Sequence, residues 1–351
     1  MKIRKGYSLA LLAAGLFGLS APLAKLLLGQ VGPVMLAALL YLGCGIGLFV
    51  LKASQRFAGI TWSEEAKPAK DDLGWLLGAV LIGGVAAPIV MMVSLTHTSA
   101  ATASLLLNFE SIATVLVAAL LFREAVGRRV WIAVVLVALA GCLLSLEIGG
   151  TWMVSIGALG VLLACVLWGL DNNLTQRISA KDPMVIALVK GIAAGCISLV
   201  LALTAGERFP GMSAMLGALV LGFVSYGLSV YLYILSLRSL GTARTGAIFG
   251  TAPFIGVVGS LILFSVTLNW QFLAALPLML MGAYLLLSER HGHVHTHDEY
   301  EHDHAHDHDT HHQHEHDAVL AGGARHAHVH KHLHMVHEHS HTPDIHHRHS
   351  H

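Results

Sequence analysis

Charged, cysteine and aromatic residues are all scarce in this chain of 351 residues. Only 12% of the residues are charged and 7% are aromatic, whereas 55% are hydrophobic. Soluble domains carry about 25% charged residues, so this composition excludes that class and favours a membrane protein. The four cysteines, Cys44, Cys142, Cys165 and Cys196, lie singly in apolar stretches. That spacing excludes a C-x-x-C site and a disulfide framework, and we expect them to pack as small hydrophobic side chains.

Catalytic signatures are missing as well. The chain has no H-E-x-x-H, no phosphate-binding loop and no G-x-S-x-G, motifs that place a metal ligand, a phosphate or a nucleophile in a defined turn. We therefore expect neither an enzyme nor ATP hydrolysis by a phosphate loop. Strands of alternating hydrophobicity are also missing, which argues against a membrane β-barrel.

The apolar residues gather in long stretches. A hydrocarbon core about 30 Å thick requires roughly 20 apolar residues per helix. The first stretch imitates a signal peptide, but it has a counterpart in the second half of the chain, so we expect it to be retained. Ten stretches of this kind are present, near 7–28, 32–51, 73–95, 99–121, 130–147, 155–176, 184–205, 214–236, 243–264 and 270–288.

Basic residues are distributed unequally between the loops. With a cytoplasmic N-terminus and ten helices, the external loops receive only Arg208. Positive charge stays on the cytoplasmic side, so both termini are predicted to be cytoplasmic. The cytoplasmic side receives Lys2, Arg4, Lys5, Lys52, Arg56, Lys67, Lys70, Arg123, Arg128, Arg129, Arg177, Lys181, Arg238, Arg244 and Arg290.

The two halves of the apolar region resemble each other. Leu12–Gly18 matches Leu163–Gly169, and Ala100, Ser104 and Asn108 fall 142 positions before Thr242, Gly246 and Gly250. Five helices per half is an odd number, so the second copy must be inverted in the membrane, as in many secondary transporters. We therefore predict an all-α integral membrane protein of ten helices. Its parts are a first five-helix repeat (1–148), a second five-helix repeat (149–290) and a disordered tail (291–351).

These segments resemble the EamA-like family of the drug/metabolite transporter superfamily. The resemblance covers about 5–288 and rests on Gly18–Lys25 (GLSAPLAK), Thr98–Glu110 (TSAATASLLLNFE), Leu121–Glu124 (LFRE) and Leu167–Thr175 (LWGLDNNLT), with GTAR at 241–244 and Ala252-Pro253. It implies a ten-helix carrier that works by alternating access, driven by an ion gradient or by antiport. Members often carry proline after the carboxylate of the fourth helix, where this chain has Ser111, and the acidic Glu124 has Val266 as its counterpart.

Three polar residues interrupt the first repeat. Glu110 lies near the middle of the fourth apolar stretch, where an acidic group costs about 2.5–3.5 kcal/mol on insertion scales. It is our first candidate for coupling or substrate binding, with a structural hydrogen bond as the alternative. Asn108 lies two residues away on another helix face. Lys25 lies near the external end of the first helix, as a snorkelling side chain, an anion site or a partner for a carboxylate.

A second polar group lies in the sixth stretch. Asp171, Asn172 and Asn173 spread around the helix, so at least one is expected to face the interior. Trp168 is four residues before Asn172 and can share its face. Lys190, in the seventh stretch, is a possible partner for Asp171. Ligand contact and capping of the inner gate are both open for this group.

Histidine is almost confined to the tail, which holds 24 of the chain's 25 histidines. The exception, His97, is expected to be an interfacial residue rather than a metal ligand. Alternate residues of an extended chain point the same way, so H-x-H can offer two imidazoles to Ni²⁺, Co²⁺ or Zn²⁺. The predicted metal ligands are His291, His293, His295, His297, His302, His304, His306, His308, His326, His328, His330, His332 and His334.

Three functions fit the sequence. The first is a carrier for a small metabolite or drug-like solute in the cytoplasmic membrane, with a cytoplasmic tail that binds divalent metal. The second is a transition-metal transporter, an exporter fed by the tail. The third is a membrane protein that senses or stores metal. We expect no required cofactor, a lipid bilayer and a small-molecule or ion substrate as partners, no nucleic acid, and a monomer or homodimer.

Overall fold

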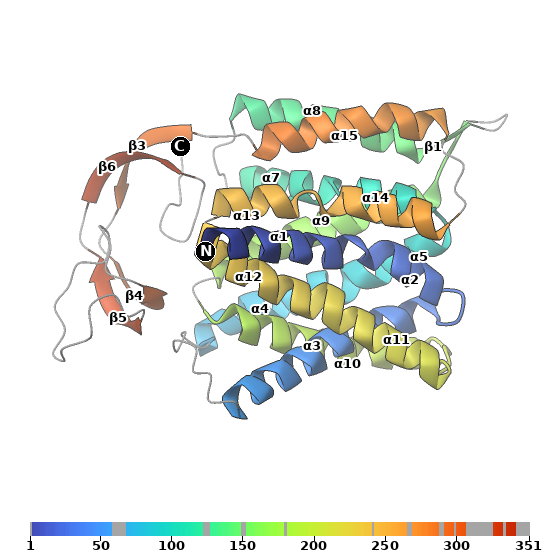
Figure 1. Ribbon diagram of the computed structural model, residues 1–351, viewed down its shortest axis with the longest axis horizontal. Coiled ribbons are helices and arrows are strands. Elements are labelled where there is room, and N and C mark those ends of the chain that lie inside the picture. The colour runs from blue at the N-terminus through green and yellow to red at the C-terminus, as the bar shows by residue number, and fades with distance from the viewer. Residues whose placement is uncertain are drawn as a thin grey trace.

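The computed structural model describes residues 2–57, 68–121, 127–148, 152–178, 181–240, 242–264, 269–287, 291–297, 300–306, 326–332 and 335–341. Its body is a bundle of helices whose axes run roughly parallel (Figure 1). The first half contains α1 (Lys2–Gly18), α2 (Ser20–Leu27), α3 (Pro33–Phe57), the short η1 (Lys70–Asp72), α4 (Leu73–Ala79), the π-helical η2 (Val80–Ala86), α5 (Ala87–Thr96), α6 (Ala100–Leu106), α7 (Phe109–Leu121) and α8 (Arg128–Ser145).

A short antiparallel pair of strands, β1 (Leu146–Ile148) and β2 (Trp152–Val154), precedes the second half. The second half contains α9 (Ile156–Arg177), α10 (Pro183–Thr204), α11 (Met212–Gly222), the π-helical η3 (Phe223–Leu228), α12 (Ser229–Leu240), α13 (Thr242–Phe249), α14 (Ala252–Leu263) and α15 (Trp270–Leu287).

Seven helices of the described residues are long and apolar enough to cross a membrane. Two shorter apolar helices, Ala252–Leu263 and Trp270–Leu285, follow them. The all-α membrane fold is therefore confirmed, whereas the count of ten helices and the cytoplasmic position of both termini stay predictions. The seven long helices are Gly6–Leu27, Pro33–Phe57, Lys70–Thr96, Ala100–Leu121, Ile156–Arg177, Pro183–Thr204 and Met212–Ser236.

The irregular turns of the helices recur at a fixed interval. The π-helical turns η2 and η3 begin at Val80 and Phe223, 143 positions apart. The fourth and ninth predicted helices are each broken in the middle, and the pieces α6 and α13 begin at Ala100 and Thr242, 142 positions apart. Chance similarity between apolar helices would not place two kinds of irregularity in register, so the structure supports the repeat independently of residue identity.

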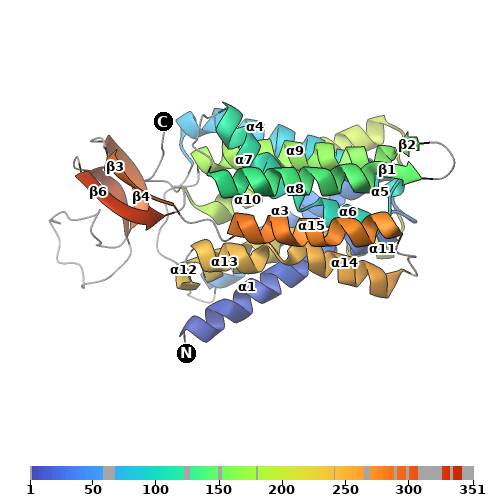
Figure 2. The same cartoon turned by 90° about the horizontal axis from the view of Figure 1, so that it is seen from above.

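Glycines let equivalent helices cross closely. A Cβ on Gly18 of α1 would lie 2.3 Å from the carbonyl oxygen of Ala252 at the start of α14, and a Cβ on Gly169 of α9 would lie 2.7 Å from the carbonyl carbon of Ala113 in α7. No side chain fits at either crossing. Helices α3 and α10 pack closely through Gly45 and Gly191, and α8 lies beside α15 in both views (Figures 1 and 2).

The tail differs from its sequence-based prediction. We expected a disordered segment, whereas the described parts form two antiparallel pairs, β3 (His291–His297) with β6 (Met335–His341) and β4 (Tyr300–His306) with β5 (His326–His332). The H-x-H pattern has a period of two, which is the period of a β-strand. Residues His308 and His334 lie outside the described residues.

Candidate functional site

Helix α9 presents its polar residues to the inside of the bundle. Its exposed apolar residues Ile156, Leu159, Leu163 and Val166 repeat every three or four positions and mark the lipid-facing side. Asn172 comes nine residues, or two and a half turns, after Leu163 and therefore lies on the opposite side. It is nevertheless exposed. Solvent therefore reaches this amide on the side of α9 that faces the other helices.

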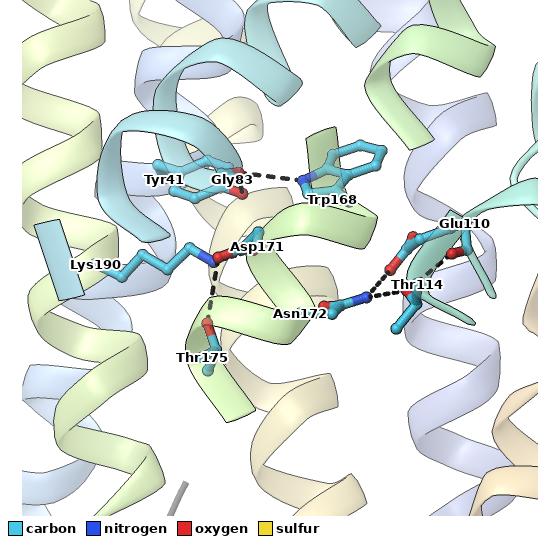
Figure 3. A network of polar contacts seen from close by, with 9 residues as sticks. All are labelled: Tyr41, Gly83, Glu110, Thr114, Trp168, Asp171, Asn172, Thr175 and Lys190. Atoms are coloured by element: carbon cyan, nitrogen blue, oxygen red, sulfur yellow. Dashed lines mark hydrogen bonds and ion pairs between the residues drawn. The ribbon is translucent and has the colours of Figure 1, made fainter. Parts of the chain in front are cut away.

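Glu110 is the partner of this exposed amide. The break between α6 and α7 places Glu110 in the first turn of α7, where it is half-buried. The Asn172 amide donates to Glu110 Oε1 at 3.0 Å and to Thr114 Oγ1 at 3.0 Å, and the Thr114 hydroxyl donates to the Glu110 carbonyl oxygen at 2.9 Å (Figure 3). The ion pairs formed by the described residues do not include Glu110. This carboxyl group is therefore held by a neutral donor.

Asp171 points to another side of α9, where it forms an ion pair with Lys190 of α10 (Figure 3). The Thr175 hydroxyl donates to its other carboxyl oxygen at 3.2 Å. The side chains of Asp171 and Lys190 are 6% and 17% exposed, so the two charges neutralise each other inside the bundle. The pairing proposed from the sequence is present.

The π-helical turn η2 connects this ion pair to two aromatic residues. The Gly83 carbonyl oxygen accepts hydrogen bonds from the Tyr41 hydroxyl at 2.8 Å and from Trp168 Nε1 at 3.1 Å (Figure 3). A Cβ on Gly83 would lie 2.0 Å from the Asp171 carboxyl carbon, so only glycine allows this contact. Sequence reasoning missed Tyr41 and Gly83, and the pair Gly83-Gly84 inside an apolar stretch was the available signal.

Three other candidates bond to backbone carbonyl groups. Asn108 is buried and donates to Leu105 at 2.9 Å, and Asn173 is buried and donates to Gly169 at 2.8 Å. Asn108 thus bonds within its own segment, whereas Asn173 also donates to the carbonyl oxygen of Thr114 at 3.0 Å and so joins α9 to α7. Lys25 donates to the carbonyl oxygens of Leu95 and Thr98, the latter at 3.0 Å, and so caps the end of α5.

Aromatic side chains form a continuous row beside the polar group. Ring centroids are separated by 6.0 Å between Tyr41 and Tyr226, 6.0 Å between Tyr226 and Phe17, 5.3 Å between Phe17 and Phe249, and 4.8 Å between Phe249 and Tyr233. All five are half-buried. Sequence reasoning did not select this row, because its members come from α1, α3, η3, α12 and α13.

The described residues of the bundle form no metal site. Among residues whose side chains the structure describes, no group of three or more His, Cys, Asp or Glu could hold a metal ion. His97 is exposed at the end of α5. The tail histidines that lie in β3 to β6 have only their backbone positions described.

Comparison with known proteins decides the family. The EamA-like transporter family matches this chain over residues 4–146 and 155–288, one match in each half. The chain belongs to the EamA-like transporter family. It is also 29% identical over 270 residues to an uncharacterized transporter of Methanothermobacter thermautotrophicus, covering 74% of this chain and 79% of that protein. A crystal structure described only as that of a protein shares the fold, with a TM-score of 0.55, 20% identity and coverage of 81% of this chain and 95% of that one.

This EamA-like protein is therefore a multi-pass membrane transporter of small solutes and not an enzyme, as the sequence predicted. The two family matches fall on the two repeats. Neither match extends into the tail, so the family says nothing of the histidines.

Proposed function

We propose that this EamA-like protein moves a small organic solute across the cytoplasmic membrane by alternating access, with Glu110 as the group that binds or is coupled to the solute. The observation that carries the proposal is the position of Glu110. It lies at a helix break, beside the exposed side chain of Asn172, and has that amide rather than a cation as its partner. A carboxyl group in this state can exchange a proton for a ligand. Asn172 is positioned to orient it.

Alternating access is supported by where the two repeats pack. Helices α2, α6 and α14 pack together at the end that the charge distribution makes external. A Cβ on Gly256 of α14 would lie 2.6 Å from the Gly18 carbonyl oxygen and 2.8 Å from Ser104 Oγ. Contacts this close exclude solute, so this end is the closed gate in our proposal. The break between α6 and α7 and the break between α13 and α14 are the points at which the two pieces of each broken helix can tilt separately.

The tail is proposed to bind Ni²⁺, Co²⁺ or Zn²⁺ on the cytoplasmic side. The register of β3 and β6 sets His293 opposite His339 and His295 opposite His337, and that of β4 and β5 sets His304 opposite His328. Residues directly opposite in an antiparallel pair are about 5 Å apart, within the reach of shared ligation. These tail histidines also support the second candidate function, export of transition metal.

One experiment separates these functions. Cells would express the full chain, Glu110→Gln, residues 1–290, or the neighbouring control Ser111→Ala. Mass spectrometry would follow organic solutes in the medium and nickel, cobalt and zinc in the cells. We expect Glu110→Gln to abolish a change in an organic solute that residues 1–290 and Ser111→Ala retain. If the full chain changes the metal content of cells and Glu110→Gln abolishes that change, metal is the cargo. If the organic solutes in the medium change equally with the full chain and with Glu110→Gln, the proposal is contradicted.

A further inference from the structure

The two repeats carry different chemistry at equivalent positions. The matched glycines Gly18 and Gly169 align Ser20, Ala21 and Pro22 of α2 with Asp171, Asn172 and Asn173 of α9. In the same way, the interval of 142 positions aligns Ala252 with Glu110. The charged and amide residues of the site therefore lie on α7, α9 and α10, and their counterparts in the other repeat are small or apolar.

The aromatic row lies on the other side of this division. Tyr226, in η3, is the counterpart of Gly83 in η2, and Phe249 of α13 is the counterpart of Leu107. One side of the bundle, formed by α7, α9 and α10, thus supplies carboxyl and amide groups. The other side, which includes α1, η3 and α13, supplies aromatic rings. The site is asymmetric although the scaffold is symmetric.

The two sides meet beside Asn172 and its partner Glu110. The ring of Tyr226 lies 6.0 Å from that of Tyr41, whose hydroxyl shares the Gly83 carbonyl oxygen with Trp168, one helical turn before Asn172. Trp168, on α9, reaches the same turn η2 that receives the Tyr41 hydroxyl. A ligand between the two sides would contact a carboxyl group at one end and aromatic rings at the other.

The charge of this region gives the sign of the ligand. Asp171 is neutralised by Lys190, and Lys25 is engaged at the end of α5. Among the side chains that the structure describes in this region, Glu110 is left as the carboxyl group with a neutral partner. A cation would supply the missing charge, and aromatic faces attract cations through the ring quadrupole. An anion would meet an unfavourable carboxylate at the same place.

We infer that the Glu110 site binds an amphipathic organic cation, with its ammonium group at Glu110 and Asn172 and its ring or hydrocarbon body against Phe17, Tyr226 and Phe249. The inference rests on the proposed function of Glu110 and narrows the solute to one chemical class. It predicts that positive charge and an aromatic body both contribute to affinity, and that each contribution is lost with its own side chain.

Four probes test charge and ring separately on the purified full chain in detergent, with a chelator present to keep metal off the tail. They are phenethylammonium, its neutral analogue phenethyl alcohol, the anion hydrocinnamate, and propylammonium, which lacks the ring. Calorimetry should show that phenethylammonium binds at least about tenfold more tightly than each of the other three. Glu110→Gln should remove its advantage over phenethyl alcohol, and Phe17→Leu its advantage over propylammonium.

The outcomes distinguish this inference from the proposed function. If hydrocinnamate or phenethyl alcohol binds as tightly as phenethylammonium, the cation assignment is wrong while Glu110-dependent transport can stand. Absence of binding by phenethylammonium to the intact chain overturns the inference as well. If Phe17→Leu fails to fold, Phe249→Leu replaces it, and the comparison of the four probes on the unmodified chain needs no variant.

Discussion

At the scale of single residues, the Asp171–Lys190 pair gives the first prediction. Removing either charge alone, by Asp171→Asn or Lys190→Met, leaves its partner buried and uncompensated, which costs about 3–5 kcal/mol of folding stability. The double variant should recover most of this loss, because no unpaired charge remains. Thermal unfolding in detergent measures it, with Lys52→Met as control, since Lys52 is 44% exposed in its pair with Asp182 and should lose only about 0.2–1 kcal/mol. A double variant as unstable as the single ones would contradict the assignment.

Gly83 gives the second prediction. Gly83→Ala places a methyl group 2.0 Å from the Asp171 carboxyl carbon, so α9 or η2 must move, and overpacking of this kind costs about 1–3 kcal/mol. Gly74→Ala in α4 is the matched control, because a Cβ there has no atom within 4 Å and should gain about 0.5–1 kcal/mol of helix stability. The two melting temperatures should therefore shift in opposite directions. Equal shifts would mean that the contact between Gly83 and Asp171 is not tight.

The sequence predicted residues that break an apolar pattern and missed residues that do not. Glu110, Asp171 and Lys190 stand out because a charge inside a membrane-length stretch needs a reason. Tyr41 and Phe17 do not stand out among their apolar neighbours. The acceptor for the Tyr41 hydroxyl is the backbone carbonyl group of Gly83, and the type of a residue does not show whether its carbonyl group accepts such a bond. Interhelical hydrogen bonds to backbone depend on local helix geometry, so they appear only once η2 is seen.

At the scale of elements, a loop between α10 and α11 caps the start of α3. The Glu207 carboxylate accepts hydrogen bonds from the backbone amides of Val34 at 3.2 Å and Met35 at 2.7 Å. The turn that delivers it contains Gly206, whose φ of 81° is in the region that favours glycine. A carboxylate at a helix N-terminus accepts hydrogen bonds from the free backbone amides and interacts favourably with the positive end of the helix dipole. The contact joins the two repeats at the end predicted to be external.

Glu207→Ala should therefore destabilise the fold by about 0.5–2 kcal/mol. Glu207→Gln keeps an acceptor oxygen and loses the charge, so its loss should be limited to the dipole contribution of about 0.3–1 kcal/mol. Thermal unfolding at low and high salt separates the two, because only the charge effect is screened. The control is Arg208→Gln in the same loop. If Glu207→Ala and Arg208→Gln have the same melting temperature, the Glu207 cap does not stabilise the start of α3.

The breaks within helices were harder to predict from the sequence than the helices themselves. The long apolar stretches predicted α3, α9 and α10 as membrane-length helices, because apolar length alone sets them. The break between α6 and α7 has no proline, and Pro253 marks only its counterpart. The repeat is what connects the two, since a proline in one copy indicates a weak point in the other.

At the scale of the whole molecule, membrane topology is the remaining prediction, and α8 decides it. Between Lys70 and Gly211 the structure has four helices long and apolar enough to span, Lys70–Thr96, Ala100–Leu121, Ile156–Arg177 and Pro183–Thr204. Four crossings would return the chain to the same side. If α8, the 18-residue Arg128–Ser145, also spans, the number is odd and Lys70 and Gly211 lie on opposite sides. The charge distribution requires the second arrangement.

Cysteine labelling distinguishes the two. Lys70 and Gly211 are both exposed, so Lys70→Cys and Gly211→Cys, made in a chain with its four cysteines changed to serine, should react with a membrane-impermeant maleimide wherever they meet it. We expect Gly211→Cys to react in intact cells and Lys70→Cys only after the membrane is opened. Reaction of both from one side would remove α8 from the membrane and end the inverted five-helix arrangement. The expected result would place the start of α4 on the cytoplasmic side and, since the charge rule then holds at this loop, the histidine tail with it.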